Sequence, residues 1–156
     1  METSAIKLVL VFAAGLLGLT CIENKAPAIV EPIEVENVCR TESDGKIVAV
    51  KGYLTLPKEV FCRRGECSLE LRSKLYGGER IGIKVQVGND PGQIDQLHSD
   101  YSNADLKLHT TTMIAGNGDL VELTGKIWFS EFLDRQCWIE VSSARKDIPA
   151  NHAANK

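Results

Sequence analysis

The chain has 156 residues, of which 44% are hydrophobic and 25% are charged, and its formal net charge is −3. This length provides enough chain for one domain with its own hydrophobic core, but not for two. The mildly acidic balance argues against nucleic acid as a partner, because nucleic-acid binding rests on the neutralisation of phosphates.

Residues 1–20 have the pattern of a secretory signal peptide. The segment Leu8–Thr20 is uniformly apolar and follows Lys7, and it is shorter than the roughly 20 apolar residues that span a bilayer. Its junction with Cys21 resembles a bacterial lipoprotein signal, although Gly18 and Thr20 replace the residues usual before the cysteine. The resemblance implies that Cys21 carries lipid and anchors the protein on the periplasmic or outer face of a membrane. The alternatives are an uncleaved anchor and cleavage at the Ala-x-Ala motif of residues 26–28.

The cysteine count supports an exported protein. Once Cys21 is set aside, an even number of cysteines remains, as expected for a domain in an oxidising compartment. These are Cys39, Cys62, Cys67 and Cys137.

The segments that flank the central part of the chain show no strand or helix pattern. Residues 21–38 contain two prolines and four glutamates with little periodicity, which predicts a flexible tether to the membrane. Residues 148–156 are small and polar, which predicts a disordered tail. The folded domain is therefore expected over residues 39–147.

Alternation of apolar and polar residues predicts five strands in the folded domain. Turn sequences such as "SDG", "YGGE", "NDPG" and "GNGD" separate them. The expected strands are residues 46–57, 67–73, 80–88, 119–129 and 137–145, with residues 105–110 as a short additional strand. The stretch 89–101 is predicted to be one short helix, with an irregular loop as the alternative.

Five strands with an insertion after the third is the order of an OB-fold, a small Greek-key barrel. Gly52 and Gly125 fall on the inner face of the first and fourth strands, where a small barrel needs close backbone approach. Residues 118–145, "GDLVELTGKIWFSEFLDRQCWIEVSSAR", resemble the fourth-to-fifth strand hairpin of bacterial tRNA-anti-like OB-fold proteins of exported lipoproteins. The fold class expected is thus an all-β, five- to six-stranded OB-like barrel, with a β-sandwich as the alternative.

An OB barrel predicts the disulfide pairing. The residue before the first strand then lies near the start of the fifth strand, so Cys39 is expected to pair with Cys137. Cys62 and Cys67 flank "RRGE" in the loop that joins the first two strands, where a local ring closes easily. The alternative for Cys137 is a reduced core residue.

The sequence contains no catalytic, metal-binding or cofactor-binding motif. No nucleophile accompanies a base in a recognised pattern, and the glycine-rich turns lack the strand–loop–helix context of phosphate loops. "CRRGEC" has no second pair of ligands, which argues against zinc. We therefore expect no enzymatic activity and no cofactor.

Two surfaces are candidates for binding. Tyr53, Trp128 and Trp138 are predicted to point outward from neighbouring strands and to converge on a patch, which indicates an envelope protein partner or a small envelope ligand. Cover by the tether, the tail or the additional strand is the alternative for these aromatics. Arg63 and Arg64 lie in a loop that would instead suit an oligonucleotide or another polyanion. The outward positions of the second and third strands carry no aromatic residue for base stacking.

Overall fold

The structure is a computed structural model, and it describes residues 31–129 and 137–147. The signal peptide, Cys21 and the C-terminal tail lie outside the described residues, so the predictions for them remain predictions. In the described part of the chain, none of the helices is both long and apolar enough to cross a membrane.

The five predicted strands are all present, with bounds close to those expected from the alternation. They are β2 (Ile47–Thr55), β4 (Glu66–Arg72), β5 (Arg80–Gln86), β8 (Leu120–Phe129) and β9 (Cys137–Lys146). Each alternates buried and less buried residues, because successive side chains of a strand point to opposite faces.

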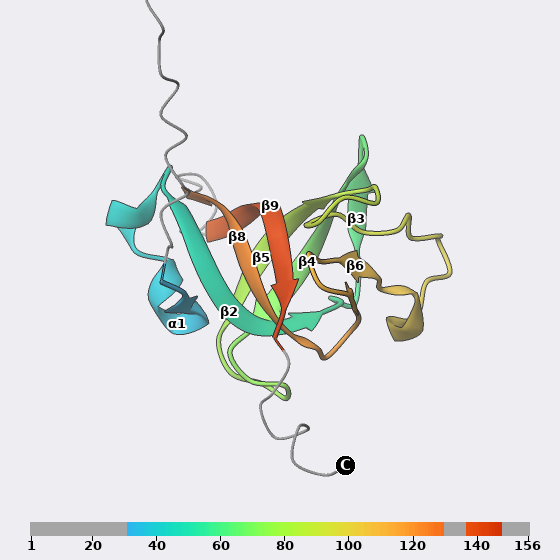
Figure 1. Cartoon of the computed structure of the whole chain (residues 1–156), viewed down its shortest axis with the longest axis horizontal. Helices are drawn as coiled ribbons and strands as arrows, with labels where there is room; N and C mark the ends of the chain where they lie inside the picture. Colours follow the sequence, from blue (N-terminus) through green and yellow to red (C-terminus); the bar gives the residue numbers. More distant parts are fainter. Residues whose placement is uncertain (1–30, 130–136, 148–156) are drawn as a thin grey trace, which may run out of the picture.

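The strands close into a barrel with Greek-key connections (Figure 1). The order of the sheet is β1-β2-β8-β9-β5-β4-β3, and a further pairing of β2 with β4 closes the five strands β2, β8, β9, β5 and β4 into a barrel. The contacts of β5 with β9 are parallel, whereas β2–β4, β2–β8, β4–β5 and β8–β9 are antiparallel. This is the OB-fold arrangement, and the predicted fold class is confirmed.

The inward positions of these strands form one hydrophobic core. Its largest fully buried side chains in the strands are those of Leu54, Leu69, Leu71, Ile81, Ile83, Leu123, Ile127 and Ile139. The same strands carry the charged residues on the opposite face, so the alternation of the sequence separates core from surface.

Gly52 and Gly125 are the sites of close backbone approach that their inward positions predicted. A Cβ at Gly52 would lie 2.8 Å from the carbonyl oxygen of Arg72. One at Gly125 would collide with the Glu140 carbonyl oxygen and lie 2.6 Å from the Ile139 side chain. The register of β8 on β9 shifts between Thr124 and Gly125, as a β-bulge does where a barrel strand bends.

Residues 33–38 are part of the folded domain, and the prediction of a flexible tether up to residue 38 is wrong for them. β1 (Ile33–Glu34) pairs in parallel with β2, and α1 (Val35–Val38) follows it directly. Val35 is 4% exposed and Val38 is fully buried. The glutamates between the apolar residues of this segment obscure any hydrophobic pattern in the sequence. Burial of the two valines offsets the conformational entropy that is lost when the segment becomes ordered.

The connection between β5 and β8 is irregular over residues 89–101, where the sequence predicted a short helix. Ile94 instead bridges to Val87 and Leu108, and the Gly92 amide donates to the His109 carbonyl. Helical structure in this connection is a single 3-10 turn, η2 (Asn103–Asp105), with Ser102 at its start. The predicted additional strand at 105–110 is reduced to β6 (Leu108–His109), which pairs with β7 (Ile114–Ala115). A further 3-10 turn, η1 (Thr41–Ser43), precedes β2.

Both predicted disulfides are present. Cys39 and Cys137 are joined with a Cα–Cα distance of 5.8 Å, which links the segment after α1 to the start of β9. Cys62 and Cys67 are joined with a Cα–Cα distance of 4.0 Å. Cys137 is therefore oxidised and is not a reduced core residue.

Candidate functional site

A hairpin formed by β3 (Phe61–Arg63) and β4 carries the two arginines that the sequence singled out. Arg64 and Gly65 form its turn with φ values of +54° and +79°. Positive φ at both central residues is the type I′ geometry that matches the twist of a two-residue hairpin. Cys62 and Cys67 are directly opposite on the two strands and are covalently joined. The arginines are thus presented by a short, cross-linked hairpin rather than by a loop.

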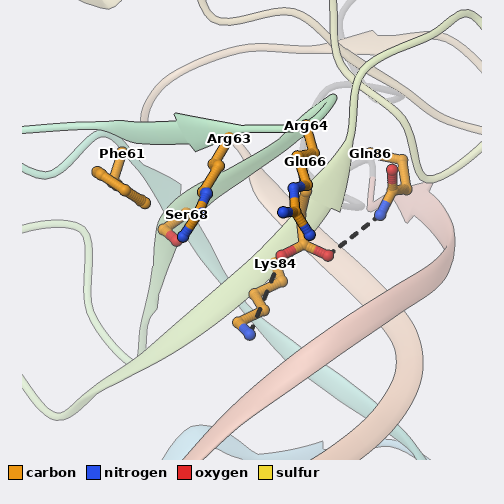
Figure 2. A pocket seen from close by; sticks show the side chains of 7 residues that line it. All are labelled: Phe61, Arg63, Arg64, Glu66, Ser68, Lys84 and Gln86. Carbon is orange, nitrogen blue, oxygen red and sulfur yellow. Dashed lines mark hydrogen bonds and ion pairs between the residues drawn. The ribbon is translucent and has the colours of Figure 1, made fainter.

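The outer face of this hairpin and of β5 contains a shallow depression of about 390 Å³ (Figure 2). Strands β3, β4 and β5 and the hairpin turn provide its lining residues. These are Phe61, Arg63, Arg64, Glu66, Ser68, Lys84 and Gln86. We call this site the hairpin depression.

Some polar side chains of the hairpin depression interact with one another, whereas its two arginines take no part in those interactions. Glu66 accepts a hydrogen bond from Gln86 at 3.1 Å and lies 3.9 Å from the ammonium group of Lys84. Neither of these interactions involves Arg63 or Arg64, and both arginines are exposed. The arginines are therefore the cationic groups at this site that can bind an added carboxylate or phosphate, and their planar guanidinium groups suit such anions.

Phe61 is the residue of this site that sequence reasoning missed. It is 67% exposed and lies opposite Ser68, on the same outer face as Arg63. The sequence predicts that the second strand begins at residue 67 and that residues 61–63 belong to a loop. It therefore predicts no inward or outward orientation for the Phe61 side chain. The alternation in "FCRRGEC" about an Arg-Gly turn is the signal that could have identified the hairpin. The outward positions of β4 and β5 carry no aromatic residue, as predicted, and the exposed ring comes from β3, which the sequence did not predict as a strand.

The three aromatic residues of the predicted patch do not converge. Trp128 and Trp138 are directly opposite on β8 and β9, and both are half-buried. Tyr53 pairs with Leu120 at the opposite end of β8, so it is remote from the tryptophans. The outward orientation predicted for the three side chains is correct. The register between the strands decides which of these side chains are neighbours.

The tryptophan pair is surrounded by charged side chains that already interact with it. Lys126 lies over the Trp128 ring at 4.0 Å and Lys84 over the Trp138 ring at 4.5 Å. The Trp128 indole N–H donates to Glu140 at 2.9 Å. Because these contacts satisfy the rings and the indole donor, the pair is an ordered part of the outer face and not an open apolar patch.

One histidine of the described residues, His109, makes a polar contact with Asp95. His109 lies 2.7 Å from Asp95, which in turn is 4.0 Å from Lys107. No serine, threonine or cysteine takes part in this contact. Within residues 31–129 and 137–147, no three His, Cys, Asp or Glu side chains form a group that could hold a metal ion.

Comparison with known proteins leaves the family of this chain open. No protein-family model matches it, and no curated protein matches it. The chain is similar to the aspartyl-tRNA synthetase of Entamoeba histolytica, with 13% identity and a TM-score of 0.45, over 92% of this chain and 28% of the synthetase. It is also similar to the asparaginyl-tRNA synthetase of Pyrococcus horikoshii, with 18% identity and a TM-score of 0.45, over 76% of this chain and 23% of the synthetase.

A third similar structure is OBody AM3L15 bound to hen egg-white lysozyme, with 13% identity and a TM-score of 0.44. The alignment covers 80% of this chain and 88% of the OBody chain. Likeness at this level carries no argument about function. The OB-fold of this chain follows from its own strand pairings.

Proposed function

We propose that this protein is a non-catalytic, lipid-anchored envelope protein whose OB barrel binds an acidic segment of a partner protein at the hairpin depression. The observation that carries the ligand class is the pair of exposed arginines, Arg63 and Arg64, on a hairpin cross-linked by Cys62 and Cys67. Because the hairpin is already ordered, little conformational entropy is lost when a ligand binds to it.

The proposed location rests on the N-terminal sequence and on the cysteines. Cys21 is the spare cysteine of the chain and stands at the end of the apolar leader. The other cysteines form two disulfides, and disulfides persist in exported proteins far more than in the cytosol. Both observations support an envelope location.

The charge pattern of the outer face favours a protein over a nucleic acid. Along β4, Glu66 and Glu70 occupy outward positions, and each is partnered by cations of the same face. Affinity for a nucleic acid rises with the number of phosphates that lysine and arginine neutralise, and the two glutamates reduce the cationic charge of this face. A polypeptide, which can place a carboxylate beside Arg63 and neutral groups beside Glu66, fits this mixed face better.

An oligonucleotide is the second candidate ligand, and Phe61 is the observation that favours it. An exposed aromatic ring beside two arginines offers one stacking surface and two phosphate contacts. Stacking on an aromatic residue contributes roughly 1–3 kcal/mol per base. A single exposed ring provides this contribution for one base only.

Binding of two labelled probes at low salt tests the proposed ligand class. The probes are a glutamate-rich synthetic peptide and a single-stranded oligothymidylate, and fluorescence anisotropy reports binding. We expect the peptide to bind the full chain, and the double variant Arg63→Gln, Arg64→Gln to bind it roughly tenfold more weakly, because each charge pair contributes about 1 kcal/mol or less. Tighter binding of the oligonucleotide would favour the second candidate.

Arg145→Gln is the control for the loss of positive charge, and it removes one charge where the double variant removes two. Arg145 is exposed on β9 and pairs with Glu122 at 2.8 Å, outside the hairpin depression. Its replacement should leave peptide binding unchanged. A loss of binding free energy in the control equal to half the loss in the double variant would mean that net charge and not the hairpin depression governs binding.

A further inference from the structure

β3 is an edge strand with one open side. It stands at the end of the sheet order, and within the described part of the chain it pairs only with β4. Figure 1 shows β3 at the rim of the barrel, next to the connection that follows β5. An edge strand presents backbone N–H and C=O groups that another chain can pair with.

The register of the hairpin identifies which residue faces the open side. In a two-residue hairpin the residues that flank the turn, Arg63 and Glu66, exchange backbone hydrogen bonds with each other. The next pair, Cys62 and Cys67, then belongs to the close, non-hydrogen-bonded type, in agreement with its Cα–Cα distance of 4.0 Å. The N–H and C=O of Cys62 therefore point away from β4, toward the open edge.

The open edge already has a partner at its beginning. The Val60 amide donates to the hydroxyl group of Tyr101 at 2.7 Å, and the same hydroxyl donates to the Lys58 carbonyl at 3.2 Å. Tyr101 thus satisfies the amide two positions before Cys62. Cys62 is the next position of the edge at which an added strand can pair.

Hollows adjoin both faces of this edge. The hairpin depression lies on the outer face. Two further hollows of about 350 and 240 Å³ lie where the residues of the opposite face meet the segment 96–101, and both are lined by Cys62 and Leu97.

The inner hollows are lined by apolar and polar side chains together. The residues that line them include no aspartate or glutamate, whereas Arg63 and Arg64 border one hollow and His98 borders the other. Val60, Val87 and Leu97 are partly buried and pack against the core, so their remaining surface is accessible in the hollows. A strand added at the edge would place alternate side chains on the two faces, one set beside the arginines and the other on these apolar residues.

We propose that the open edge of β3 binds an extended acidic segment of a partner protein as an added strand, with Cys62 exchanging backbone hydrogen bonds with it. This inference rests on the proposed function and adds the mode of recognition. Glutamate or aspartate side chains of the segment lie beside Arg63 and Arg64, and its alternate apolar side chains enter the hollows at Leu97. Main-chain pairing then provides affinity, and the hollows provide the selection of side chains.

The direct test is hydrogen exchange of the Cys62 amide in the full chain. The probe is a synthetic peptide of alternating glutamate and valine. We expect this amide to exchange about tenfold or more slowly when the peptide is bound, because it acquires a hydrogen-bond acceptor. Peptide binding that depends on the arginines but leaves Cys62 exchange unchanged would overturn strand addition and leave the proposed function standing. Failure of the peptide to bind would overturn both.

Two N-methylated versions of the peptide separate strand pairing from electrostatics. One carries methyl groups on the amides of its glutamates and the other on those of its valines, so their charges are identical. Amides of alternate residues point to the same side of a strand, so one version should bind about tenfold more weakly while the other is unaffected. Equal binding of the two versions contradicts the proposal.

Leu97→Glu tests the hollows, and Leu75→Glu is its control. Leu75 is 40% exposed and precedes β5, outside the lining of the hollows. Leu97→Glu should weaken binding of the alternating peptide about tenfold, because it places a carboxylate in an apolar contact with an acidic ligand. Leu75→Glu should leave the affinity unchanged, and an equal loss in both variants contradicts the proposal.

The oligothymidylate is the other macromolecular probe, and protection of Cys62 by it would overturn the assignment to a polypeptide.

Discussion

Trp128 and Trp138 face each other across β8 and β9 on the outside of the barrel, and each ring carries a lysine ammonium group above it. Glu140 accepts the hydrogen bond of the Trp128 indole. The pair is therefore a cross-strand contact with its own partners, which changes what a mutation there is expected to do.

Trp128→Ala should lower the free energy of unfolding by about 1–2 kcal/mol, because it removes a half-buried aromatic ring together with one cation–π contact and the hydrogen bond to Glu140. A fully buried Trp→Ala change costs about 3–5 kcal/mol. Urea unfolding of the wild-type and Trp128→Ala proteins measures the difference between their free energies of unfolding. Lys126→Gln, which keeps the rings and removes only one cation, should cost less than Trp128→Ala. A loss in the range of a buried tryptophan would contradict the half-buried environment.

Gly125→Ala should destabilise the barrel by about 1–3 kcal/mol or more, because the added Cβ collides with the backbone of Glu140 and forces the strands apart. Gly82→Ala is the matched control. A Cβ at Gly82 would meet only the Trp138 Cβ at an ordinary 3.7 Å. Thermal unfolding of the two variants should therefore differ strongly, and similar melting temperatures would contradict the close approach at Gly125.

Loss of the two disulfides should have unequal effects. The disulfide between Cys39 and Cys137 spans 98 residues, whereas that between Cys62 and Cys67 spans 5. The chain-entropy model assigns about 4–5 kcal/mol to the long loop and roughly 2 kcal/mol to the short one. Paired Cys→Ser variants compared by denaturant unfolding measure both losses. Equal losses would indicate that loop length does not govern the contributions.

The Asp105 carboxyl should titrate below its usual range because the Ser102 side chain donates a hydrogen bond to it, which lowers the pKa of Asp105. A folded-state pKa below the unfolded value stabilises the fold above the unfolded pKa. That contribution is lost as the pH falls through the folded pKa of Asp105. Ser102→Ala should raise this pKa toward its ordinary value, as measured by NMR titration of the carboxyl carbon.

Glu36 provides the control for that titration. The Ser73 side chain lowers the pKa of Glu36 in the same manner, at the other end of the domain. Ser102→Ala should leave the Glu36 titration unchanged, and Ser73→Ala should affect Glu36 without affecting Asp105. A shift of both carboxyls in either variant would point to a general loss of structure.

Cys21→Ala should release the protein from the membrane fraction or leave its precursor uncleaved, because the lipid is proposed to be attached at this residue. Fractionation of cells that express either form, followed by mass spectrometry of the mature N-terminus, measures the outcome. Wild-type protein that is already released and begins at another residue would contradict the anchor.

The strands, their inward residues and the disulfide pairing could be predicted from the sequence. Alternation of apolar and polar residues is a local consequence of the pleated backbone, so the bounds of β2, β4, β5, β8 and β9 follow closely from it. The pairing of Cys39 with Cys137 followed once the order of the strands indicated a barrel. Arg63 and Arg64 were found as candidates by their charge alone.

Other features depended on contacts between residues distant in sequence. Tyr53 and Trp128 both face outward, but the register of β2 on β8 places them at opposite ends of the strand. Val35 and Val38 read as parts of a tether until the barrel provides a surface on which to bury them. Ile94 bridges to two strands instead of joining a helix. Local pattern determines which face a side chain takes, whereas register and burial, which decide what it meets, are set by the free energy of the whole packed barrel.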